Sequence, residues 1–335
     1  MNMAKPSVLI SILNWNNAGE TINCVASLLD EAKSPAADVQ IRVIDNGSAQ
    51  ADYLALCAGA EQLGFSIARL EHNLGFTGGH NTSIEWAVEQ GIDYIWMLNN
   101  DATVKPGCLP KLVAALETDK GLGAVSPVIE PEGSGHPVAA WGGMHEWSSR
   151  RTVWFASEAE SLQKHQEMPG EIFVAGTAIM LRTRAMAEIG KLDDRLFAYY
   201  DDSDLGVRLA RQGWRSKVVF DATIEHGWRE VEQLPPYFFY LYYRNEMIFL
   251  STHVPAEHRR WLWLKMVDQA LFNAERFARK GMKVQADALL LGIWDFALAR
   301  HGRPRLDRTV PLPIRLASKL SNFVNRSQLA QHDKA

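Results

Sequence analysis

Short, continuously apolar segments alternate with amphipathic ones through the first hundred residues, and this alternation limits the possible folds more than any other feature. The apolar segments are rich in β-branched residues and too short for ordinary helices, so they predict strands. They lie at residues 8–13, 39–44, 65–70 and 94–98. The segments between them have helical periodicity, at residues 19–30, 51–63 and 79–89. Apolar strands separated by helices predict a mostly parallel sheet covered on both faces, and therefore an α/β fold.

Beyond residue 100 the pattern is less regular. We expect helices at 106–116, 183–189 and 203–212, and strands at 124–129, 172–181 and 216–220. Residues 130–170 have no clean period and predict a long excursion with at most a hairpin around 144–155. Helical patterns then follow at 237–251, 257–280 and 284–300. The domain boundaries expected from these patterns are 1–230 for the sheet domain, 231–302 for a helical extension and 303–335 for a loosely ordered tail rich in Pro and Arg.

The net charge of −4 is the sum of two unlike parts, because residues 1–228 carry −11 and residues 229–335 carry +7. The basic C-terminal helices also contain aromatic residues, which suits an anionic membrane surface, and a solvated bundle or a homo-oligomer contact is an equally good explanation. We expect no nucleic-acid partner, because the acidic first two-thirds would repel phosphates.

Cysteine usage and hydropathy bear on the compartment. Cys24, Cys57 and Cys108 are too few and too scattered for a disulfide framework, which favours a reducing, cytoplasmic setting. The most apolar helical stretch, residues 237–250, is interrupted by Arg244, Asn245 and Glu246 and is too short to cross a bilayer. We therefore expect a cytoplasmic protein.

Polar residues follow the ends of the first four predicted strands. They are Asn14 and Asn16, then Asp45 and Asn46, then His72 and Asn73, and finally Asn99, Asn100 and Asp101. In an open parallel sheet, ligands bind beyond the carboxyl ends of the strands. Asn, Asp and Gly also mark turns, so each position alone has a structural explanation. Their coincidence at one sheet edge favours a ligand crevice.

A glycine-rich segment at residues 75–81 follows the third strand and opens a helix, which suits close approach of the backbone to an anionic ligand. Gly78 and Gly79 form its expected turn, and Asn81 lies just behind them. The segment lacks the Gly-Lys-Ser/Thr ending of a Walker loop and the spacing of a dinucleotide fingerprint. Residues 14–19 also lack dinucleotide-binding glycines, so an NAD enzyme is not expected.

A second polar cluster, containing Asp201, Asp202 and Asp204, precedes an amphipathic helix. One carboxylate suffices to cap a helix, and Asp204 is also spaced for an ion pair with Arg208 four residues later. The surplus makes Asp202 the candidate for chemistry. His226 follows a predicted strand, and a single histidine of this kind has a structural explanation unless Asp101 supplies a carboxylate to the same divalent ion.

These segments together resemble the family-2 glycosyltransferases of the GT-A fold, in particular the rhamnosyltransferase-like branch that builds bacterial surface polysaccharides. The matching segments are 10–16 (ISILNWN), 43–48 (VIDNGS), 73–81 (NLGFTGGHN), 98–101 (LNND), 197–205 (FAYYDDSDL) and 225–227 (EHG). Their order and spacing match over about residues 7–228, and 242–245 (YYRN) is similar to the start of that branch's C-terminal extension. Six segments in register are far more specific than any one of them.

The resemblance implies a role for each matching residue. Asp45 would hydrogen-bond the pyrimidine of a nucleotide-sugar, Asn14 and Asn16 would line the base pocket, and Asn81 would lie near the ribose or diphosphate. The remaining residues implied in donor binding are Asn46, Gly78, Gly79, Asn99, Asn100 and Asp201. Asp101 would be the last residue of an Asp-x-Asp metal motif, and His226 a further ligand of Mg²⁺ or Mn²⁺. Asp202 would be the catalytic base.

The implied reaction is a single-displacement, inverting transfer, in which the metal stabilises the leaving diphosphate and a carboxylate takes the acceptor's proton. The implied donor is dTDP-L-rhamnose and the implied acceptor a lipid-linked or growing polysaccharide at the inner face of the plasma membrane. The chain departs from the family at Asn99-Asn100-Asp101, which has one carboxylate where the general motif has two. A sugar-nucleotide pyrophosphorylase and a non-catalytic carbohydrate-binding or scaffold protein are the alternatives.

Overall fold

The computed structural model describes residues 5–133, 140–147, 151–227 and 230–324, with the backbone alone at 151, 257–264 and 322–324. The chain forms two compact units. The first consists of residues 1–146, 151–193 and 201–228, and the second of residues 147–150, 194–200 and 229–335.

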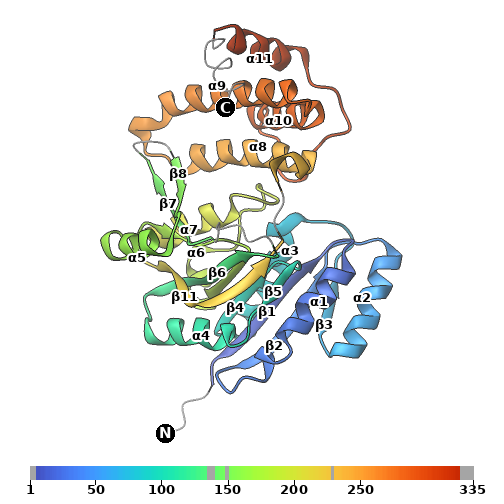
Figure 1. The fold of residues 1–335 in the computed structure, drawn as a ribbon, viewed down its shortest axis with the longest axis vertical. Coiled ribbons are helices and arrows are strands. Elements are labelled where there is room, and N and C mark those ends of the chain that lie inside the picture. The colour runs from blue at the N-terminus through green and yellow to red at the C-terminus, as the bar shows by residue number, and fades with distance from the viewer. Residues whose placement is uncertain (1–4, 134–139, 148–150, 228–229, 325–335) are drawn as a thin grey trace. The chain divides into compact units, whose positions relative to one another are not determined.

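An eight-stranded sheet forms the centre of the first unit (Figure 1). Its strands, in spatial order, are β3 (Ser66–Arg69), β2 (Asp38–Asp45), β1 (Ser7–Asn14), β4 (Tyr94–Leu98), β10 (Ala178–Arg182), β6 (Leu122–Pro131), β11 (Arg215–His226) and β5 (Ala102–Val104). The pairs that β1 makes with β2 and β4, β2 with β3, and β6 with β11 are parallel. Strand β10 is antiparallel to both neighbours, and β5 to β11. The expected α/β class with a mostly parallel sheet is confirmed.

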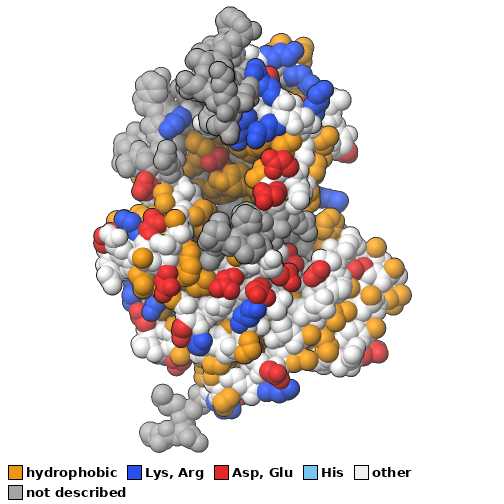
Figure 2. Space-filling view, viewed as in Figure 1, with side chains coloured by type: hydrophobic (Ala, Val, Ile, Leu, Met, Phe, Trp, Pro, Cys, Tyr) orange, Lys and Arg blue, Asp and Glu red, His pale blue; other side chains and the backbone are white. Residues whose placement is uncertain are grey.

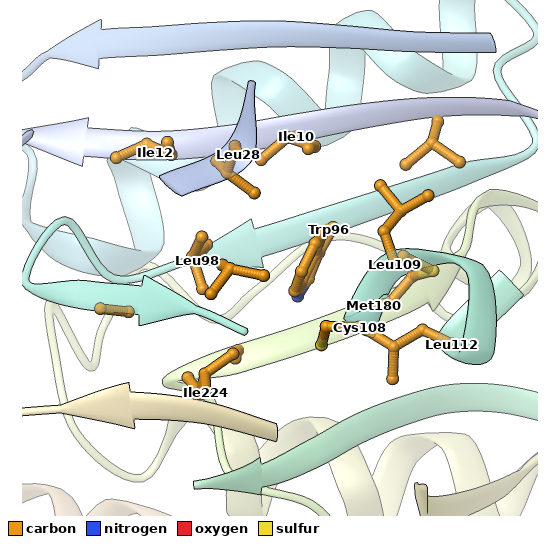
Figure 3. Close-up of a cluster of buried hydrophobic side chains, with 14 of the residues drawn as sticks. Ile10, Ile12, Leu28, Trp96, Leu98, Cys108, Leu109, Leu112, Met180 and Ile224 are labelled. Atoms are coloured by element: carbon orange, nitrogen blue, oxygen red, sulfur yellow. The ribbon is translucent and has the colours of Figure 1, made fainter. Parts of the chain in front are cut away.

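Alternating side chains along the central strands divide the core into two layers, one on each face of the sheet. Ile10, Trp96 and Met180 point to one face, where they pack with residues of the helices that cover it (Figure 3). Leu9 and Ile95 belong to the core on the other face. Because strands buried on both faces need apolar residues at every position, the continuous apolar runs of the sequence form these strands.

Helices cover both faces of the sheet (Figure 1). Residues of α1 (Ala18–Leu28), α2 (Gln50–Leu63) and α4 (Cys108–Thr118) pack in the first core. Residues of α3 (Gly75–Glu89), α6 (Thr183–Ile189) and α7 (Asp201–Arg211) pack in the second. Helix α3 begins at Gly75, four residues earlier than expected, so Gly78 and Gly79 lie inside its first turns rather than in a loop before it. A short 3₁₀ turn, η1 (Glu31–Lys33), follows α1.

The expected hairpin in the excursion is confirmed by the antiparallel pair β7 (Gly143–Glu146) and β8 (Arg151–Trp154). Two further expectations, one just after the excursion and one within it, were wrong. Residues 172–181 form two strands, β9 (Ile172–Phe173) and β10, because the chain turns at Gly176. Helix α5 (Glu158–Glu167) was not expected, because its sequence is mostly polar; Ser157 caps it by accepting a hydrogen bond from the amide of Glu160 at 3.2 Å.

The second unit is helical. After a 3₁₀ turn, η2 (Val231–Gln233), its helices are α8 (Pro236–His253), α9 (Ala256–Arg279), α10 (Lys283–Ala297) and α11 (Leu312–Val324). Helices α8 and α10 approach closely at Gly292, where any side chain would collide with the carbonyl group of Tyr240. The tail expected to be loosely ordered contains α11, whose Ile314 packs in the helical core. Among the described helices, none combines the length and the apolar character that a membrane span requires.

Candidate active site

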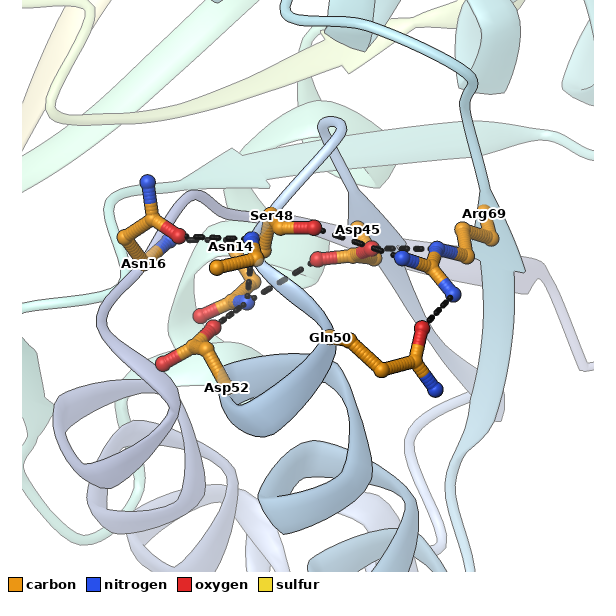
Figure 4. A network of polar contacts seen from close by, with 8 residues as sticks. Asn14, Asn16, Asp45, Ser48, Gln50, Asp52 and Arg69 are labelled. Carbon is orange, nitrogen blue, oxygen red and sulfur yellow. Dashed lines mark hydrogen bonds and ion pairs between the residues drawn. The ribbon is translucent and has the colours of Figure 1, made fainter.

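The carboxyl ends of β1 and β2 bring Asn14 and Asp45 together, as the parallel register of these strands pairs the two residues. Both side chains are fully buried. The Asn14 amide nitrogen donates to Oδ1 of Asp45 at 3.2 Å, to Oγ of Ser48 at 3.2 Å and to Oδ2 of Asp52 at 2.8 Å (Figure 4). These contacts hold the Asp45 carboxylate in one orientation at the sheet edge.

Arg69, the last residue of β3, lies on the other side of Asp45. Its Nε is 3.3 Å from Oδ2 of Asp45, and its other nitrogens donate to the side chain of Gln50 at 3.0 Å and the carbonyl of Ser48 at 3.3 Å. The guanidinium also lies 3.9 Å above the centre of the Tyr53 ring. Arg69 therefore supplies the positive charge that a buried carboxylate requires.

Thr21, on α1, extends this network toward β4. Its hydroxyl donates to Oδ1 of Asn14 at 2.8 Å and accepts from the amide of Asn100 at 3.0 Å. The ends of β1, β2 and β4 are thus joined by one chain of hydrogen bonds. Asn14, Asp45 and Asn100 were expected at this edge, whereas no role was expected for Thr21, Ser48, Asp52 or Arg69.

Three further asparagines that the sequence indicated hold the backbone. The exposed Asn16 accepts from the amide of Ala49 at 2.8 Å and has a left-handed backbone (φ 53°). Asn46 donates to the carbonyl of Gly75 at 3.0 Å and accepts from the amide of Leu74 at 2.9 Å. Both ends of the Asn81 amide contact the backbone of Leu192, at 3.0 and 2.9 Å.

Gly79 has a packing role. A Cβ atom at this position would come within 2.8 Å of Leu13 and 3.3 Å of the Asn46 side chain. Because glycine has only a hydrogen atom in place of a side chain, α3 can lie close against β1 at this position. Gly78, one residue earlier, lies half-buried in the same helix.

Asp101 and His226 meet at the end of β4, although they are far apart in the sequence. Strand β11 extends six residues further than expected and ends at His226, which pairs with Ala102 of β5. Nε2 of His226 lies 3.0 Å from Oδ1 of Asp101 and 3.2 Å from the amide nitrogen of Asn99. A single ring nitrogen cannot donate to the first and accept from the second at the same time.

The same pair fits a divalent cation. Two ligands at right angles, each about 2.1 Å from a metal, are about 3 Å apart, which is the separation of Oδ1 and Nε2 here. Both side chains are partly exposed, so an ion from solvent can reach them. No cluster of three or more His, Cys, Asp or Glu suited to a metal is found in the described part of the chain. The remaining groups that coordinate such a cation would come from water and from a bound anionic molecule.

Asp202 lies in the first turn of α7, next to the turn between β9 and β10. Its Oδ2 accepts from the amide of Gly176 at 3.2 Å, and its Oδ1 from the amide of Ser203 at 2.7 Å. A Cβ at Gly176 would contact Oδ2 of Asp201 at 3.1 Å, so this glycine admits both carboxylates. Burial raises the pKa of Asp202 above its usual range, and the two amide contacts oppose this only in part.

The turn also connects Asp202 with the strand end that carries Asp101. The amide of Asn99 donates to the carbonyl of Thr177, the residue after Gly176, at 2.9 Å. Asp202, whose pKa is raised, is thus connected through the turn between β9 and β10 to the end of β4, where Asp101 and His226 meet. Asp204 has the structural role that its spacing allowed, since Arg208 donates to its Oδ2 at 2.8 Å.

The residues just before Asp201 have an unusual backbone. Phe197, Tyr199 and Tyr200 all have positive φ angles, of 67°, 70° and 65°. Within the second unit, the fully buried Arg244 and Asn245 of α8 bind this segment. Arg244 donates to the carbonyls of residues 195 and 196 at 3.2 and 3.0 Å, and Asn245 to those of 196, 198 and 199 at 2.8, 2.7 and 3.0 Å. These bonds stabilise a conformation that non-glycine residues adopt at a cost.

Known proteins similar to this chain in sequence are glycosyltransferases. Residues 7–190 match the family model described as glycosyl transferase family 2. A Mycobacterium tuberculosis N-acetylglucosaminyl-diphospho-decaprenol L-rhamnosyltransferase is 30% identical over 174 residues, which is 46% of this chain and 56% of that protein. Galactofuranosyltransferase GlfT1 of the same organism is 26% identical over 191 residues, 55% of this chain and 59% of that protein. The matches thus span a little over half the length of these relatives.

Solved structures share the fold at low sequence identity. S. aureus TarS 1–349 in complex with UDP-GlcNAc has a TM-score of 0.58 at 13% identity, covering 98% of this chain and 91% of that one. The mannosyltransferase PcManGT from Pyrobaculum calidifontis, in complex with GDP-Man and Mn²⁺, has a TM-score of 0.52 at 14% identity, covering 96% and 85%. The expected GT-A fold is confirmed by these neighbours.

Proposed function

The chain belongs to glycosyl transferase family 2, and from this premise we propose that it transfers a sugar, with inversion, from a nucleotide-sugar to a saccharide acceptor. The observation that carries the proposal is the backbone connection between Asp202 and the Asp101–His226 pair. Gly176 donates to Asp202, and the next residue accepts from the amide of Asn99. A proton acceptor is thereby fixed beside groups that suit a diphosphate-bound cation.

The nucleotide end of the donor is assigned to the Asn14–Asp45 network. Oδ2 of Asp45 has an ion-pair contact with Arg69 but accepts no hydrogen bond from the described residues. It therefore has capacity for one more donor, such as the N3–H of a pyrimidine. Asn14 and Asn16 line the same edge. The stacking of Arg69 on Tyr53 leaves its charge directed at Asp45 rather than at a phosphate.

Asp202 is assigned as the base. Direct displacement at the anomeric carbon requires one group to take the proton of the acceptor hydroxyl. The raised pKa of Asp202 makes its carboxylate a stronger proton acceptor at neutral pH. Hydrogen bonds from Gly176 and Ser203 fix the direction of both oxygens, so the carboxylate needs little reorganisation when the acceptor binds.

Asp101 and His226 are the residues that would hold Mg²⁺ or Mn²⁺. When bound, such an ion supplies Lewis-acid stabilisation of the charge that develops on a leaving diphosphate. Asn99 contacts His226 and accepts from the thiol of Cys24 through its carbonyl at 3.5 Å, which fixes the end of β4 beneath the pair. Asn100 is fixed through Thr21.

The relatives support one choice of donor and acceptor. The M. tuberculosis protein named an L-rhamnosyltransferase supports dTDP-L-rhamnose as the donor and a lipid-linked saccharide as the acceptor. Such an acceptor would place the protein at the inner face of the plasma membrane. The galactofuranosyltransferase match supports a galactofuranosyl nucleotide as the competing donor.

A donor panel tests the proposal. dTDP-rhamnose, UDP-galactofuranose and UDP-GlcNAc would be titrated with and without Mn²⁺. Slow hydrolysis of each donor would be measured as the release of its nucleoside diphosphate. We expect saturable, Mn²⁺-stimulated release from one donor, and inversion at the anomeric carbon by NMR. Asp202→Asn should retain donor binding and lose about 10²-fold or more of the turnover.

Asp38→Asn is the matched control, because it makes the same change at an exposed carboxylate at the other end of β2. Two results would overturn the proposal. Donor binding with no release in the wild-type protein would indicate a non-catalytic binding protein. Formation of a nucleoside triphosphate from donor and pyrophosphate would indicate a pyrophosphorylase.

A further inference from the structure

Among the described side chains of helix α11, those that pack in or donate to the helical unit lie mainly on one face. Ile314 packs in the core, and Ser318 donates from its buried hydroxyl to the carbonyl of Leu271 at 3.4 Å. Ser321 donates to Asp268 at 2.5 Å. The chain leading into α11 is also anchored, because Arg308 pairs with the fully buried Asp295. These contacts fix which side of the helix faces outward.

The outward face carries three leucines at intervals of four residues. Leu312, Leu316 and Leu320 are 67%, 55% and 67% exposed. At 100° per residue they form a stripe about 80° wide. Single exposed leucines are common on protein surfaces, but three in a row on one ordered helix form a continuous apolar strip.

Two cations border the same strip. Lys319 and Arg315 are exposed, and their positions on the helix fall directly beside Leu312 on the side away from Leu320. Arg315 also lies 3.5 Å from Oδ1 of Asp287 on α10, and because both side chains are solvent-exposed this contact is weak and leaves the guanidinium accessible. Figure 2 shows Lys and Arg side chains together with hydrophobic ones over the region where Figure 1 places α11 and the chain leading into it. Between Asp295 and Asp333 the sequence contains a single acidic residue, Asp307.

This charge distribution distinguishes between possible partners. A second copy of the chain, related by a two-fold axis, would bring Arg315 and Lys319 against the same cations, which is repulsive. An anionic lipid surface offers phosphates for the cations and an apolar layer for the leucines, and amphipathic helices of this kind lie in the interface plane. Long Lys and Arg side chains reach the headgroups while the helix lies deeper.

We propose that α11 docks the protein on an anionic phospholipid bilayer, with Leu312, Leu316 and Leu320 inserted at the acyl boundary and Arg315 and Lys319 on lipid phosphates. The inference rests on the proposed function only in that a lipid-linked acceptor would be presented at this surface. Helix α11 lies in a segment that the sequence patterns predicted to be loosely ordered.

Flotation with vesicles tests the inference on the full chain. Vesicles of phosphatidylcholine containing 30% phosphatidylglycerol should carry the wild-type protein to the top of the gradient, and pure phosphatidylcholine vesicles at least about tenfold less. The triple variant Leu312→Gln, Leu316→Gln, Leu320→Gln should lose about tenfold or more of the binding. Gln is chosen because its helix propensity is close to that of Leu.

The matched control replaces three exposed apolar residues outside α11, as Leu54→Gln, Leu162→Gln and Val284→Gln, whose side chains are 57%, 42% and 65% exposed. It should float like the wild type. Equal flotation of the α11 variant and the wild type, or no flotation of the wild type, would overturn the inference. So would a dimer in sedimentation equilibrium that the α11 variant abolishes while vesicle binding is absent.

Donor hydrolysis in solution separates this inference from the proposed function. The α11 variant should hydrolyse the nucleotide-sugar at the wild-type rate, because the substituted residues lie outside the candidate active site. A protein that floats but hydrolyses no donor contradicts the proposed function and leaves the docking surface supported. A protein that hydrolyses donor but does not float contradicts the docking surface and leaves the proposed function supported.

Discussion

The side-chain amide of Asn245 donates to the carbonyl oxygen of Ala198 at 2.7 Å, between contacts with the carbonyls of Leu196 and Tyr199 on either side. The segment that it holds contains three non-glycine residues with positive φ and continues without interruption into Asp201 and Asp202. Local strain of this kind persists only when surrounding contacts determine it. The Arg244–Asn245 pair of α8 provides those contacts.

Asn245→Ala should therefore affect both stability and turnover. It removes the side-chain donor that the carbonyls of Leu196, Ala198 and Tyr199 share, although that of Leu196 keeps its bond from Arg244, and we expect a loss of about 2 to 4 kcal/mol in the free energy of unfolding. Because the released segment leads directly to the proposed base, kcat should fall about tenfold or more while donor KM changes little. Urea denaturation and steady-state kinetics at a temperature where the variant is folded measure the two effects.

Asn273→Ala provides the control for this experiment. Asn273 is a half-buried asparagine on α9 whose amide donates to the hydroxyl of Tyr243 at 3.0 Å. It should lose stability without a selective effect on kcat. A parallel fall in the activity of both variants at equal folded fraction would show that Asn245 has no special influence on the site.

Glu246, the next residue of α8, should make the stability of the helical unit depend on pH. Burial raises its pKa from 4.5 to about 7, and the hydroxyl of Tyr200, which hydrogen-bonds it, opposes this only in part. The folded state retains the proton up to about pH 7, whereas the unfolded chain releases it near 4.5. Stability therefore decreases as pH rises through this window, by up to about 3 kcal/mol.

Glu246→Gln tests this directly. Gln cannot ionise, so the variant should be more stable than the wild type at pH 8 and should lose the decrease between pH 5 and 7.5. Glu232→Gln, at an exposed position of η2, should leave the wild-type pH dependence intact. Denaturation midpoints at several pH values measure the difference. An unchanged slope in Glu246→Gln would assign the effect to another group.

Arg69 should matter through its geometry as well as its charge. Arg69→Ala removes the counter-charge of the buried Asp45, and we expect about 2 kcal/mol of destabilisation together with weaker nucleotide binding. Arg69→Lys retains the charge but cannot contact Asp45, Gln50 and Ser48 together while stacking on Tyr53. It should give an intermediate result.

Calorimetric titration with dTDP and urea denaturation distinguish these outcomes. Arg42→Lys is the matched control, because Arg42 also lies on an aromatic ring, that of Trp86 at 4.8 Å, and no carboxylate pairs with it in the part of the chain that the structure describes. It should bind dTDP like the wild type. Equal nucleotide affinity in Arg69→Ala and the wild type would remove the Asn14–Asp45 network from the donor site.

The sequence predicted the parts of the site that directly follow apolar strands. Asn14, Asp45, Asn99 and Asp101 stand at strand ends, and parallel pairing brings such ends to one edge whatever the details of the loops. Thr21 and Asp52 could not be identified in the same way, because a polar residue on a helix has the same pattern whether it faces solvent or a network.

Two other features could not be predicted from the local sequence pattern. The turn at Gly176 lies inside an apolar run, so residues 172–181 were expected to form one strand, and the amide contact with Asp202 could not be anticipated. Helix α11 begins close to several prolines, which favoured an irregular tail. Its stability depends on tertiary contacts of Ile314 and Ser318, which local propensity does not contain.

The Asp101–His226 pair should bind Mn²⁺ in the absence of donor. We expect Asp101→Asn and His226→Ala each to reduce Mn²⁺ affinity at least about tenfold, since each removes a ligand. His72→Ala, at an exposed position, is the control. Electron paramagnetic resonance of free Mn²⁺ in a titration measures affinity without any catalytic readout. If neither variant differs from the wild type, the ion is held by other residues.

The pH dependence of turnover should identify the base. Because Asp202 must be deprotonated to accept a proton, kcat/KM should rise with pH through the pKa of Asp202, which burial places above the usual aspartate range, and then level off. Asp202→Glu should retain an acidic limb at a shifted pH with reduced kcat. Asp202→Asn should have a low rate without that limb. Initial rates with saturating acceptor between pH 4 and 8 measure the profile, and an acidic limb that persists in Asp202→Asn would assign the proton transfer to a different group.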